Sequence, residues 1–161
     1  IVKGEKYNPA NKEANKAAAK AQGVDLGGNF NKLIEKFNTA KANGLKRPAL
    51  TYQLHNFPNK KLKIYPALTT GKNPGFLYVK LSDLYLGKID NEGILIKSKD
   101  FESVFGVDEF LKEIAKDPVK FSAIHGRNIG SCCFCARELT TKESLTAGYG
   151  PICAEKWELP W

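Results

Sequence analysis

The amino-acid sequence predicts an α+β fold, in which helices pack on a small antiparallel sheet and a small cysteine-containing module follows. Apolar residues recur at helical spacing between residues 29 and 44, and five short strand-like runs separated by turn residues extend to residue 97. Three of the four cysteines then fall between residues 132 and 135. A chain of 161 residues is long enough for one ordinary core plus a satellite that needs a metal.

The amino-terminal part changes character near residue 29. Residues 1–28 are polar and rich in Lys, Ala and Asn, so we expect a linker or a loosely ordered helix over 12–21 there. An amphipathic helix is predicted from Asn29 to Gly44, because one face collects the apolar residues Phe30, Leu33, Ile34, Phe37 and Ala40. No methionine occurs, so we expect Ile1 to follow a cut or a longer parent chain.

Strands and short helices fill the middle of the chain. The predicted strands cover residues 49–55, 61–65, 76–81, 85–89 and 94–97, and the tight turns between them indicate antiparallel neighbours. A helix is expected over 107–115, and Asp117-Pro118 opens a second, short helix towards Ile124. We therefore expect an α+β domain over 29–120 and a separate module over 121–161.

The cysteine spacing indicates a metal site in that module. Cys132 and Cys135 form a CxxC pair, with which a tight turn presents two thiolates to one zinc ion. Cys153 follows Pro151, which suits the first position of a helix, where the helix dipole favours a thiolate. A short helix is also expected over 142–145, capped by Thr140 or Thr141. A knuckle followed by a ligand-bearing helix is the plan of treble-clef-like zinc modules.

Three residues compete for the fourth zinc ligand. His125 lies seven residues before Cys132 and would complete a set of three cysteines and one histidine. Cys133 would make an all-cysteine set, although consecutive side chains usually point apart, and Glu155 is the third candidate. We expect His125. Ordinary disulfides are disfavoured because Cys132, Cys133 and Cys135 are too close together in sequence.

The module also resembles a known group of domains. Its pattern is a CxxC knuckle, Arg137-x-Leu-Thr, Ser144 and then Gly148-x-Gly-Pro-x-Cys. This pattern resembles a family of small uncharacterised domains in phage and bacterial proteins, often at the end of longer chains. Ala136 stands where that family commonly has glycine. The resemblance covers about the last 35 residues and implies a zinc-binding fold near phage or mobile-element DNA transactions, but no reaction.

Positive charge is concentrated in the first half of the chain. The net charge of +8 is the sum of +6 in residues 1–47, +5 in 48–88 and −3 in 89–161. Lysines alternate with aromatic residues in the predicted strands, as in proteins that bind single strands by stacking and charge. We expect a nucleic-acid-binding face formed by Lys60, Lys61, Lys63, Tyr65, Tyr78 and Lys80.

The leading hypothesis is a nucleic-acid-associated binding protein with a structural zinc site, such as a phage or mobile-element accessory factor. The competing hypothesis is an inhibitor or adaptor that docks on a host or phage protein through the acidic second half, the segment from Phe101 to Phe105 and the aromatic end (Trp157, Pro160 and Trp161). No Walker phosphate loop, HExxH or GxSxG motif indicates an enzyme. No apolar run suits a bilayer and none resembles a signal peptide, so we expect a cytoplasmic location and no membrane partner.

Overall fold

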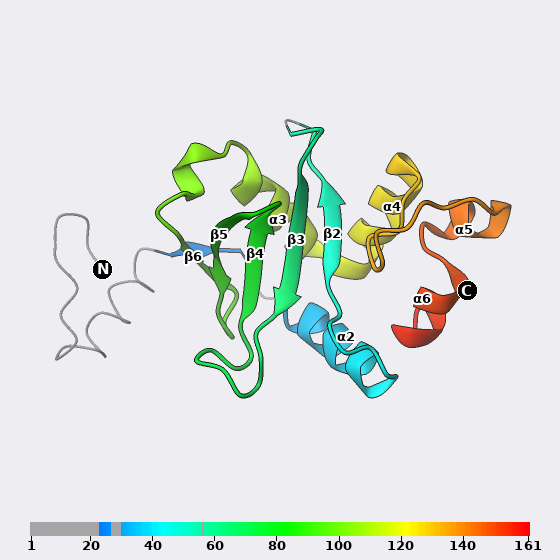
Figure 1. Cartoon of the computed structure of the whole chain (residues 1–161), viewed down its shortest axis with the longest axis horizontal. Helices are drawn as coiled ribbons and strands as arrows, with labels where there is room; N and C mark the ends of the chain where they lie inside the picture. The colour runs from blue at the N-terminus through cyan, green and yellow to red at the C-terminus, as the bar shows by residue number, and fades with distance from the viewer. Residues whose placement is uncertain (1–22, 27–29, 56) are drawn as a thin grey trace, which may run out of the picture.

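The computed structural model describes residues 23–26, 30–55 and 57–161, and over these residues it confirms the α+β class (Figure 1). One antiparallel sheet has the strand order β1-β6-β5-β4-β3-β2. The strands are β1 (Val24–Asp25), β2 (Leu50–Gln53), β3 (Lys61–Pro66), β4 (Leu77–Leu81), β5 (Leu84–Ile89) and β6 (Ile94–Lys97). The expected linker or helix over 12–21 lies outside the described residues.

Five of the six strands lie where the sequence predicts them. The exception is β1, in which Val24 pairs with Leu95 and Asp25 with Ile94. A two-residue strand has no alternation that a sequence pattern can detect, and its position depends on pairing with the distant edge strand β6. The hairpin turns have the predicted tight-turn residues, including Gly93, which has a positive φ of 80°.

Burial alternates along the central strands, which defines an inner and an open face of the sheet. Leu62 and Ile64 of β3 are fully buried, while Lys61 and Lys63 on either side of Leu62 are exposed. The inner face packs against α2 (Phe30–Ala42) and α3 (Val107–Lys116), whose apolar residues join the same core. Figure 1 shows the open face of β3 to β5 towards the viewer, with α3 behind.

The carboxyl-terminal segment lies beside β2, at one edge of the sheet (Figure 1). After the 3₁₀ turn η2 (Phe101–Ser103) and α3 come α4 (Pro118–Ile129), α5 (Lys142–Ala147) and α6 (Pro151–Lys156). Helix α4 begins at the predicted proline but continues past Ile124 to Gly130, whose φ of 73° ends it. Among the described residues, no helix has the length and apolar character needed to cross a bilayer.

Apolar packing is continuous from the sheet into this segment. The ring centroids of Phe37 in α2 and Trp157 after α6 are 5.5 Å apart, and Trp157 is fully buried. The Thr51 N–H of β2 donates to the Cys133 carbonyl at 2.8 Å, which ties the sheet edge to the cysteine turn. The division into separate units near residue 120 stays a prediction. Variants that disturb the packing between the two regions can test it.

Candidate functional site

A tight turn after α4 presents the first two thiols. The Cys132 N–H donates to the Arg137 carbonyl at 2.8 Å, and the Ala136 N–H donates to the Cys132 carbonyl at 2.7 Å. Ser131 and Glu138 pair as an isolated antiparallel bridge at the base of the turn. These bonds fold residues 132–135 back on themselves, so that the side chains of Cys132 and Cys135 lie on the same side.

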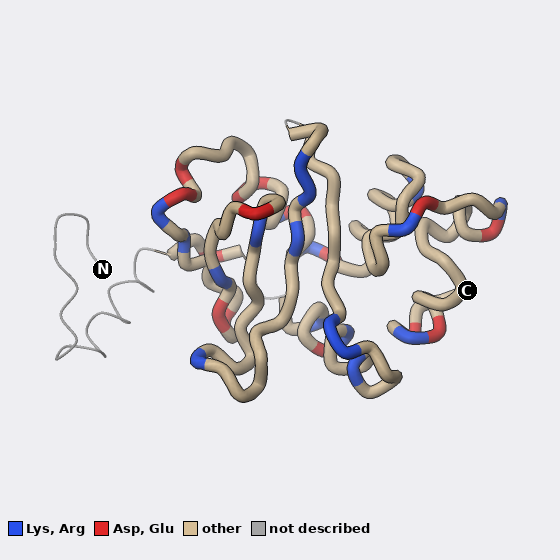
Figure 2. Tube along the Cα trace, viewed as in Figure 1, with Lys and Arg blue, Asp and Glu red and all other residues tan. Residues whose placement is uncertain are grey.

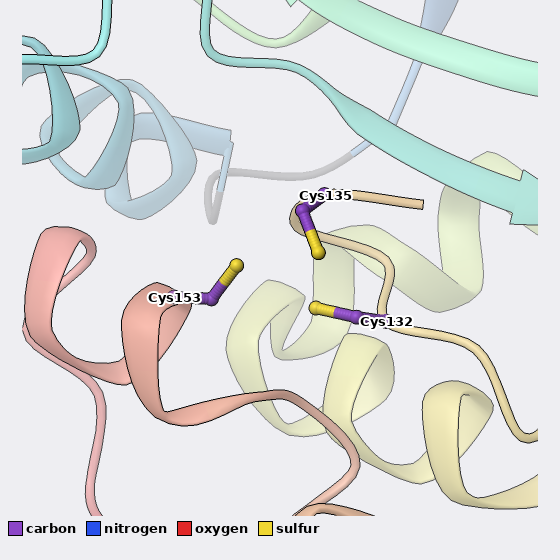
Figure 3. A group of neighbouring side chains, drawn as sticks. All are labelled: Cys132, Cys135 and Cys153. Carbon is purple, nitrogen blue, oxygen red and sulfur yellow. The ribbon is translucent and has the colours of Figure 1, made fainter. Parts of the chain in front are cut away.

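The third thiol comes from the first turn of α6. Gly150 is the residue before the helix and Pro151 begins it, as the sequence predicts. Cys153 then points towards the cysteine turn (Figure 3). The Gly150 N–H also donates a hydrogen bond to the Cys132 sulfur, so the start of α6 both supplies one thiol and contacts another.

The sulfur atoms of Cys132, Cys135 and Cys153 all lie within 4.8 Å of one another (Figure 3). Cys132 and Cys153 are buried, whereas Cys135 is exposed. Hydrogen bonding from the Cys132 thiol, then from Cys153, lowers the pKa of Cys135 to about 2, and the Arg137 N–H and charge add to this effect. The hydrogen bond to Cys135 raises the pKa of Cys132, and hydrogen bonds with Cys132, then with Cys135, raise the pKa of Cys153. Three convergent sulfurs that share negative charge form a site that could hold a metal ion.

Two glycines allow the helices around the cysteines to approach closely. Gly148 ends α5 with a φ of 89°, and a Cβ placed on it would lie 2.0 Å from the Ala123 carbonyl oxygen of α4. A Cβ on Gly126 of α4 would lie 2.1 Å from the Gly148 carbonyl oxygen. Only residues without a side chain fit this contact, which brings the start of α6, and with it Cys153, against α4.

An aromatic layer supports the cysteine turn from inside. Phe134 lies between Cys132 and Cys135 in sequence, and its ring centroid is 5.0 Å from that of Trp157 and 5.8 Å from that of Tyr149. The Tyr149 hydroxyl donates to the Pro160 carbonyl, which fastens the end of the chain over this layer. The turn is therefore held by packing as well as by its backbone bonds.

A second candidate site covers the open face of the sheet. Two neighbouring rows of side chains run across the strands: Tyr65 lies opposite Tyr78, and Lys63 lies opposite Lys80. The ring centroids of Tyr65 and Tyr78 are 5.6 Å apart, and the Lys63 ammonium lies 5.9 Å from the Tyr65 ring centroid. Strands β3, β4 and β5 contain no acidic residue, and the lysines stand out on them in Figure 2.

A β-bulge extends these rows onto β5. The register between β4 and β5 shifts after Val79, so that Tyr85 lies opposite Lys80 and Lys88 lies opposite Tyr78. Tyr85 and Lys88 are three residues apart and would face opposite sides of a regular strand. Gly87 permits the irregular backbone, with a φ of 151° and no room for a Cβ beside the Ile96 carbonyl. Tyr85 thereby packs edge-on against Tyr78, with centroids 6.1 Å apart.

Comparison with known families identifies the part of the chain that contains the cysteine site. Residues 123–158 match a family of unknown function (DUF6011). The match begins in α4 and ends after α6, and it includes all four cysteines. No curated protein and no solved structure matches the chain. The DUF6011 match agrees with the place of the sequence resemblance, and it assigns neither a zinc-knuckle family nor an activity to the chain.

Within the DUF6011 segment, the structure brings Cys132, Cys135 and Cys153 together but leaves His125 outside the cluster. The His125 Nε2 accepts a hydrogen bond from the Gln53 N–H at 3.0 Å, and the ring stacks on Phe121 with centroids 6.0 Å apart. The expectation that His125 completes the ligand set is therefore corrected: α4 continues through residue 125 and directs the ring to β2. Burial, then the charge of Lys61, lowers the pKa of His125.

The other two candidates for a fourth ligand are also outside the cluster. Cys133 is fully buried, and burial raises the pKa of its thiol. A negative charge on Cys133 would raise the pKa of the neighbouring Tyr52 hydroxyl. Glu155 is exposed and follows Cys153 by two residues in α6. Residues two apart in a helix do not share a face, so Glu155 points away from the sulfurs.

The predicted nucleic-acid-binding residues separate into two groups. Lys61, Lys63, Tyr65, Tyr78 and Lys80 lie on β3 and β4, whereas Lys60 lies in the turn before β3. The prediction did not include Tyr85 and Lys88, although both belong to the same alternation of aromatic residues and lysines. The bulge places them on the open face together, and the only sign of it in the sequence is Gly87 within a strand pattern.

Proposed function

We propose that the open face of the sheet binds single-stranded nucleic acid, and that zinc held by Cys132, Cys135 and Cys153 supports the carboxyl-terminal segment. The observation that carries the first part is the pair of rows on β3 and β4, one of tyrosines and one of lysines. Stacking on tyrosine suits any unpaired base, and a neighbouring row of ammonium groups suits the phosphates of the same strand.

The arrangement favours a single strand over a duplex. The three rings of Tyr65, Tyr78 and Tyr85 lie next to one another on the pleated surface of β3, β4 and β5. Burial, the largest cause, raises the pKa of Tyr65 and of Tyr85, so both hydroxyls remain neutral beside phosphate. Bases in a duplex offer no free face to such rings, whereas an extended single strand offers one base after another.

The proposal is tested by fluorescence anisotropy with single-stranded DNA, single-stranded RNA and duplex DNA at two salt concentrations. Reversing both Lys63 and Lys80 to Glu should abolish binding, because the lysine row changes from two positive to two negative charges. Tyr78→Leu should weaken binding of single strands by roughly 1–3 kcal/mol, the value of one stacked base. Reversing both Lys32 and Lys112 to Glu, two exposed lysines on α2 and α3 away from the open face, is the control with the same change of charge and should bind as the wild type does.

Wild-type protein that binds none of these oligonucleotides at low salt would refute the nucleic-acid proposal. Equal losses in the variant with both Lys32 and Lys112 reversed to Glu would show that net charge, not the two rows, is responsible. A steep decrease of affinity with salt is expected because each phosphate contact releases counterions. The phage or mobile-element setting rests on the sequence resemblance alone.

Zinc is the metal that the donor set favours. Tetrahedral zinc with Zn–S distances of about 2.3 Å holds its sulfurs about 3.8 Å apart, so three thiols already within 4.8 Å need only a small contraction. Zinc bound there would join the cysteine turn to α6 and thus fix the two ends of residues 132–153 to each other. The purified protein should contain one zinc per chain by elemental analysis, and Cys153→Ser should lose it, whereas Cys133→Ser should keep it.

A protein partner is the second candidate, and exposed apolar residues in the second half of the chain favour it. Ile152 and Trp161 are each 62% exposed, and Phe105 is 80% exposed. Trp157, which the sequence suggested for such a surface, is instead fully buried against Phe37 and Phe134. Docking through apolar side chains would depend little on salt, which separates it from phosphate binding.

A further inference from the structure

The chain contains few residues that could complete the metal site. The sequence has four cysteines and two histidines, and the structure describes all six. Three cysteines form the cluster, and neither Cys133, His125 nor His55 is part of it. His55 lies exposed in the turn after β2, while the cluster lies in the turn after α4 and at the start of α6.

Each excluded side chain has another structural role or direction. The His125 Nε2 accepts a hydrogen bond from the Gln53 N–H, and its ring packs against Tyr52, Phe110 and Phe121. Releasing it would leave the partly buried Gln53 N–H of strand β2 without its acceptor, which is unfavourable. Cys133 is buried on the side of Tyr52, between two residues that point to the metal position.

The cluster is accessible to solvent from one side. Cys132 and Cys153 are buried, but Cys135 is exposed, and Figure 3 shows the three cysteine side chains pointing towards one another. Four-coordinate zinc with three protein ligands keeps its last position for a molecule from outside. The exposed side at Cys135 is the route by which such a molecule would arrive.

We propose that the metal centre has three protein ligands, Cys132, Cys135 and Cys153, and an exchangeable fourth position that a neutral nitrogen donor of the imidazole class can take from water. This inference rests on metal binding as proposed above. A divalent ion with three thiolates carries one net negative charge, which disfavours carboxylates and phosphates. Imidazole adds no charge and completes the common set of three cysteines and one histidine.

The proposal also separates the two sites chemically. Phosphate should bind the lysine and tyrosine rows of the sheet but not the metal centre. The metal centre therefore has no direct part in holding nucleic acid, and a ligand at its fourth position would be a small molecule or a histidine side chain of another chain.

The test uses the full chain loaded with Co²⁺, whose ligand-field absorption reports the ligands directly. Titration with free imidazole should shift these bands with a saturable one-to-one isotherm, and acetate or inorganic phosphate should act at least about tenfold more weakly. X-ray absorption of the zinc-loaded protein should show three sulfurs at about 2.3 Å and one lighter atom at about 2.0–2.1 Å. The variants His125→Gln, Glu155→Gln and Cys133→Ser should retain the wild-type cobalt spectrum.

Four sulfurs in the absorption data, or a cobalt spectrum unchanged by imidazole, would overturn the open position. A changed spectrum in one of the three variants would overturn it as well, because that residue would then be the fourth ligand. Failure to take up Co²⁺ or Zn²⁺ at all would refute metal binding itself, and so is distinguishable from a closed four-ligand site. Oligonucleotide binding that persists in Cys153→Ser would leave the sheet proposal standing in each of these cases.

Discussion

Ala136 and Gly130 are matched in backbone conformation on either side of the first two cysteines. Ala136 has a φ of 62° and Gly130 a φ of 73°, so both lie in the left-handed region that favours glycine. A Cβ on Gly130 would have no heavy atom within 4 Å, so a substitution there tests conformation alone. The family that the module resembles commonly has glycine at the position of Ala136, for which the positive φ is the physical reason.

Exchanging these residues should change stability in opposite directions. Ala136→Gly should raise the free energy of unfolding by about 1 kcal/mol, because it relieves a left-handed alanine. Gly130→Ala should lower it by a similar amount, about 1 kcal/mol. Urea unfolding of the zinc-loaded proteins measures both. A destabilised Ala136→Gly would mean that the flexibility of glycine in the unfolded chain outweighs the relief of strain.

His125 should make stability depend on pH. Burial lowers its pKa below the ordinary value of 6.5, so the unfolded chain binds the proton more readily than the folded chain. Its contribution is complete above pH 6.5 and is lost as the pH falls through the folded value. His125→Gln retains an acceptor for the Gln53 N–H but does not titrate. The melting temperature of the wild type should therefore fall more steeply than that of His125→Gln below pH 6.5, and parallel curves would contradict this.

At the residue scale, sequence spacing was sufficient for the three cysteines but not for His125. A CxxC pair and a cysteine after Gly-Pro each determine a local geometry, and local geometry is what spacing reports. The direction of the His125 ring depends on where α4 ends, and α4 ends at Ile129, before Gly130, rather than near Ile124. The hydrogen bond from Gln53, 72 residues away, is a tertiary contact that no local pattern contains.

At the element scale, α4 and the end of α5 approach each other closely beside the cysteine site. The Gly-x-Gly-Pro segment has two glycines with different roles. Gly148 is in the left-handed region and faces the backbone of α4, whereas Gly150 has a φ of −87° and a Cβ placed on it would have no heavy atom within 4 Å. The pair offers an internal control, since the two residues are two positions apart in the same loop.

Gly148→Ala should destabilise the protein by about 3 kcal/mol or more, because the new methyl group would meet the Ala123 carbonyl and the backbone would be strained. Gly150→Ala should cost no more than about 1 kcal/mol. Urea unfolding measures stability, and zinc retention against a chelator shows whether Cys153 is still in position. Similar losses in both variants would show that the close approach to α4 is not what the first glycine provides.

The strands and helices were predictable to within a few residues wherever a periodic pattern extended over four or more positions. β3 alternates exposed lysines with buried aliphatic residues, and Phe30, Leu33, Phe37 and Ala40 of α2 are all buried as their spacing predicts. β1 and the bulge at Gly87 could not be predicted in this way. Both depend on pairing with another strand. The bulge interrupts the alternation of side chains along β5, and β1 is too short for alternation to be recognised.

At the scale of the whole molecule, α2 joins the sheet to the carboxyl-terminal segment. The Lys36 ammonium donates to the carbonyls of Trp157 at 3.2 Å and Glu158 at 3.0 Å, and Phe37 packs on Trp157. The Asn43 side chain and the Lys156 ammonium each donate to the other residue's carbonyl oxygen, at 2.9 Å in both cases. Contacts between residues so far apart in the chain leave no local pattern in the sequence. The sequence alone therefore suggests a division near residue 120.

These contacts predict which regions open when the metal is removed. Hydrogen exchange after treatment with a chelator should increase most in residues 131–161, since the cysteine turn and α6 lose their common ligand. It should increase less in α2, whose outer side loses Trp157 as a partner but whose inner side remains on the sheet. Strands β4 and β5 should keep their protection, because their hydrogen bonds and core contacts are within the sheet.

The pattern of exchange decides between three architectures. Loss confined to residues 131–161 would support two independent units and the division near residue 120. Loss over the whole sheet would show one cooperative core that the metal stabilises globally. The intermediate result is expected because Phe37 is fully buried between the two regions, so that opening one side uncovers part of α2 without removing its packing on the sheet. Phe37→Leu should then weaken this coupling, and the exchange of α2 should respond less to the chelator than in the wild type.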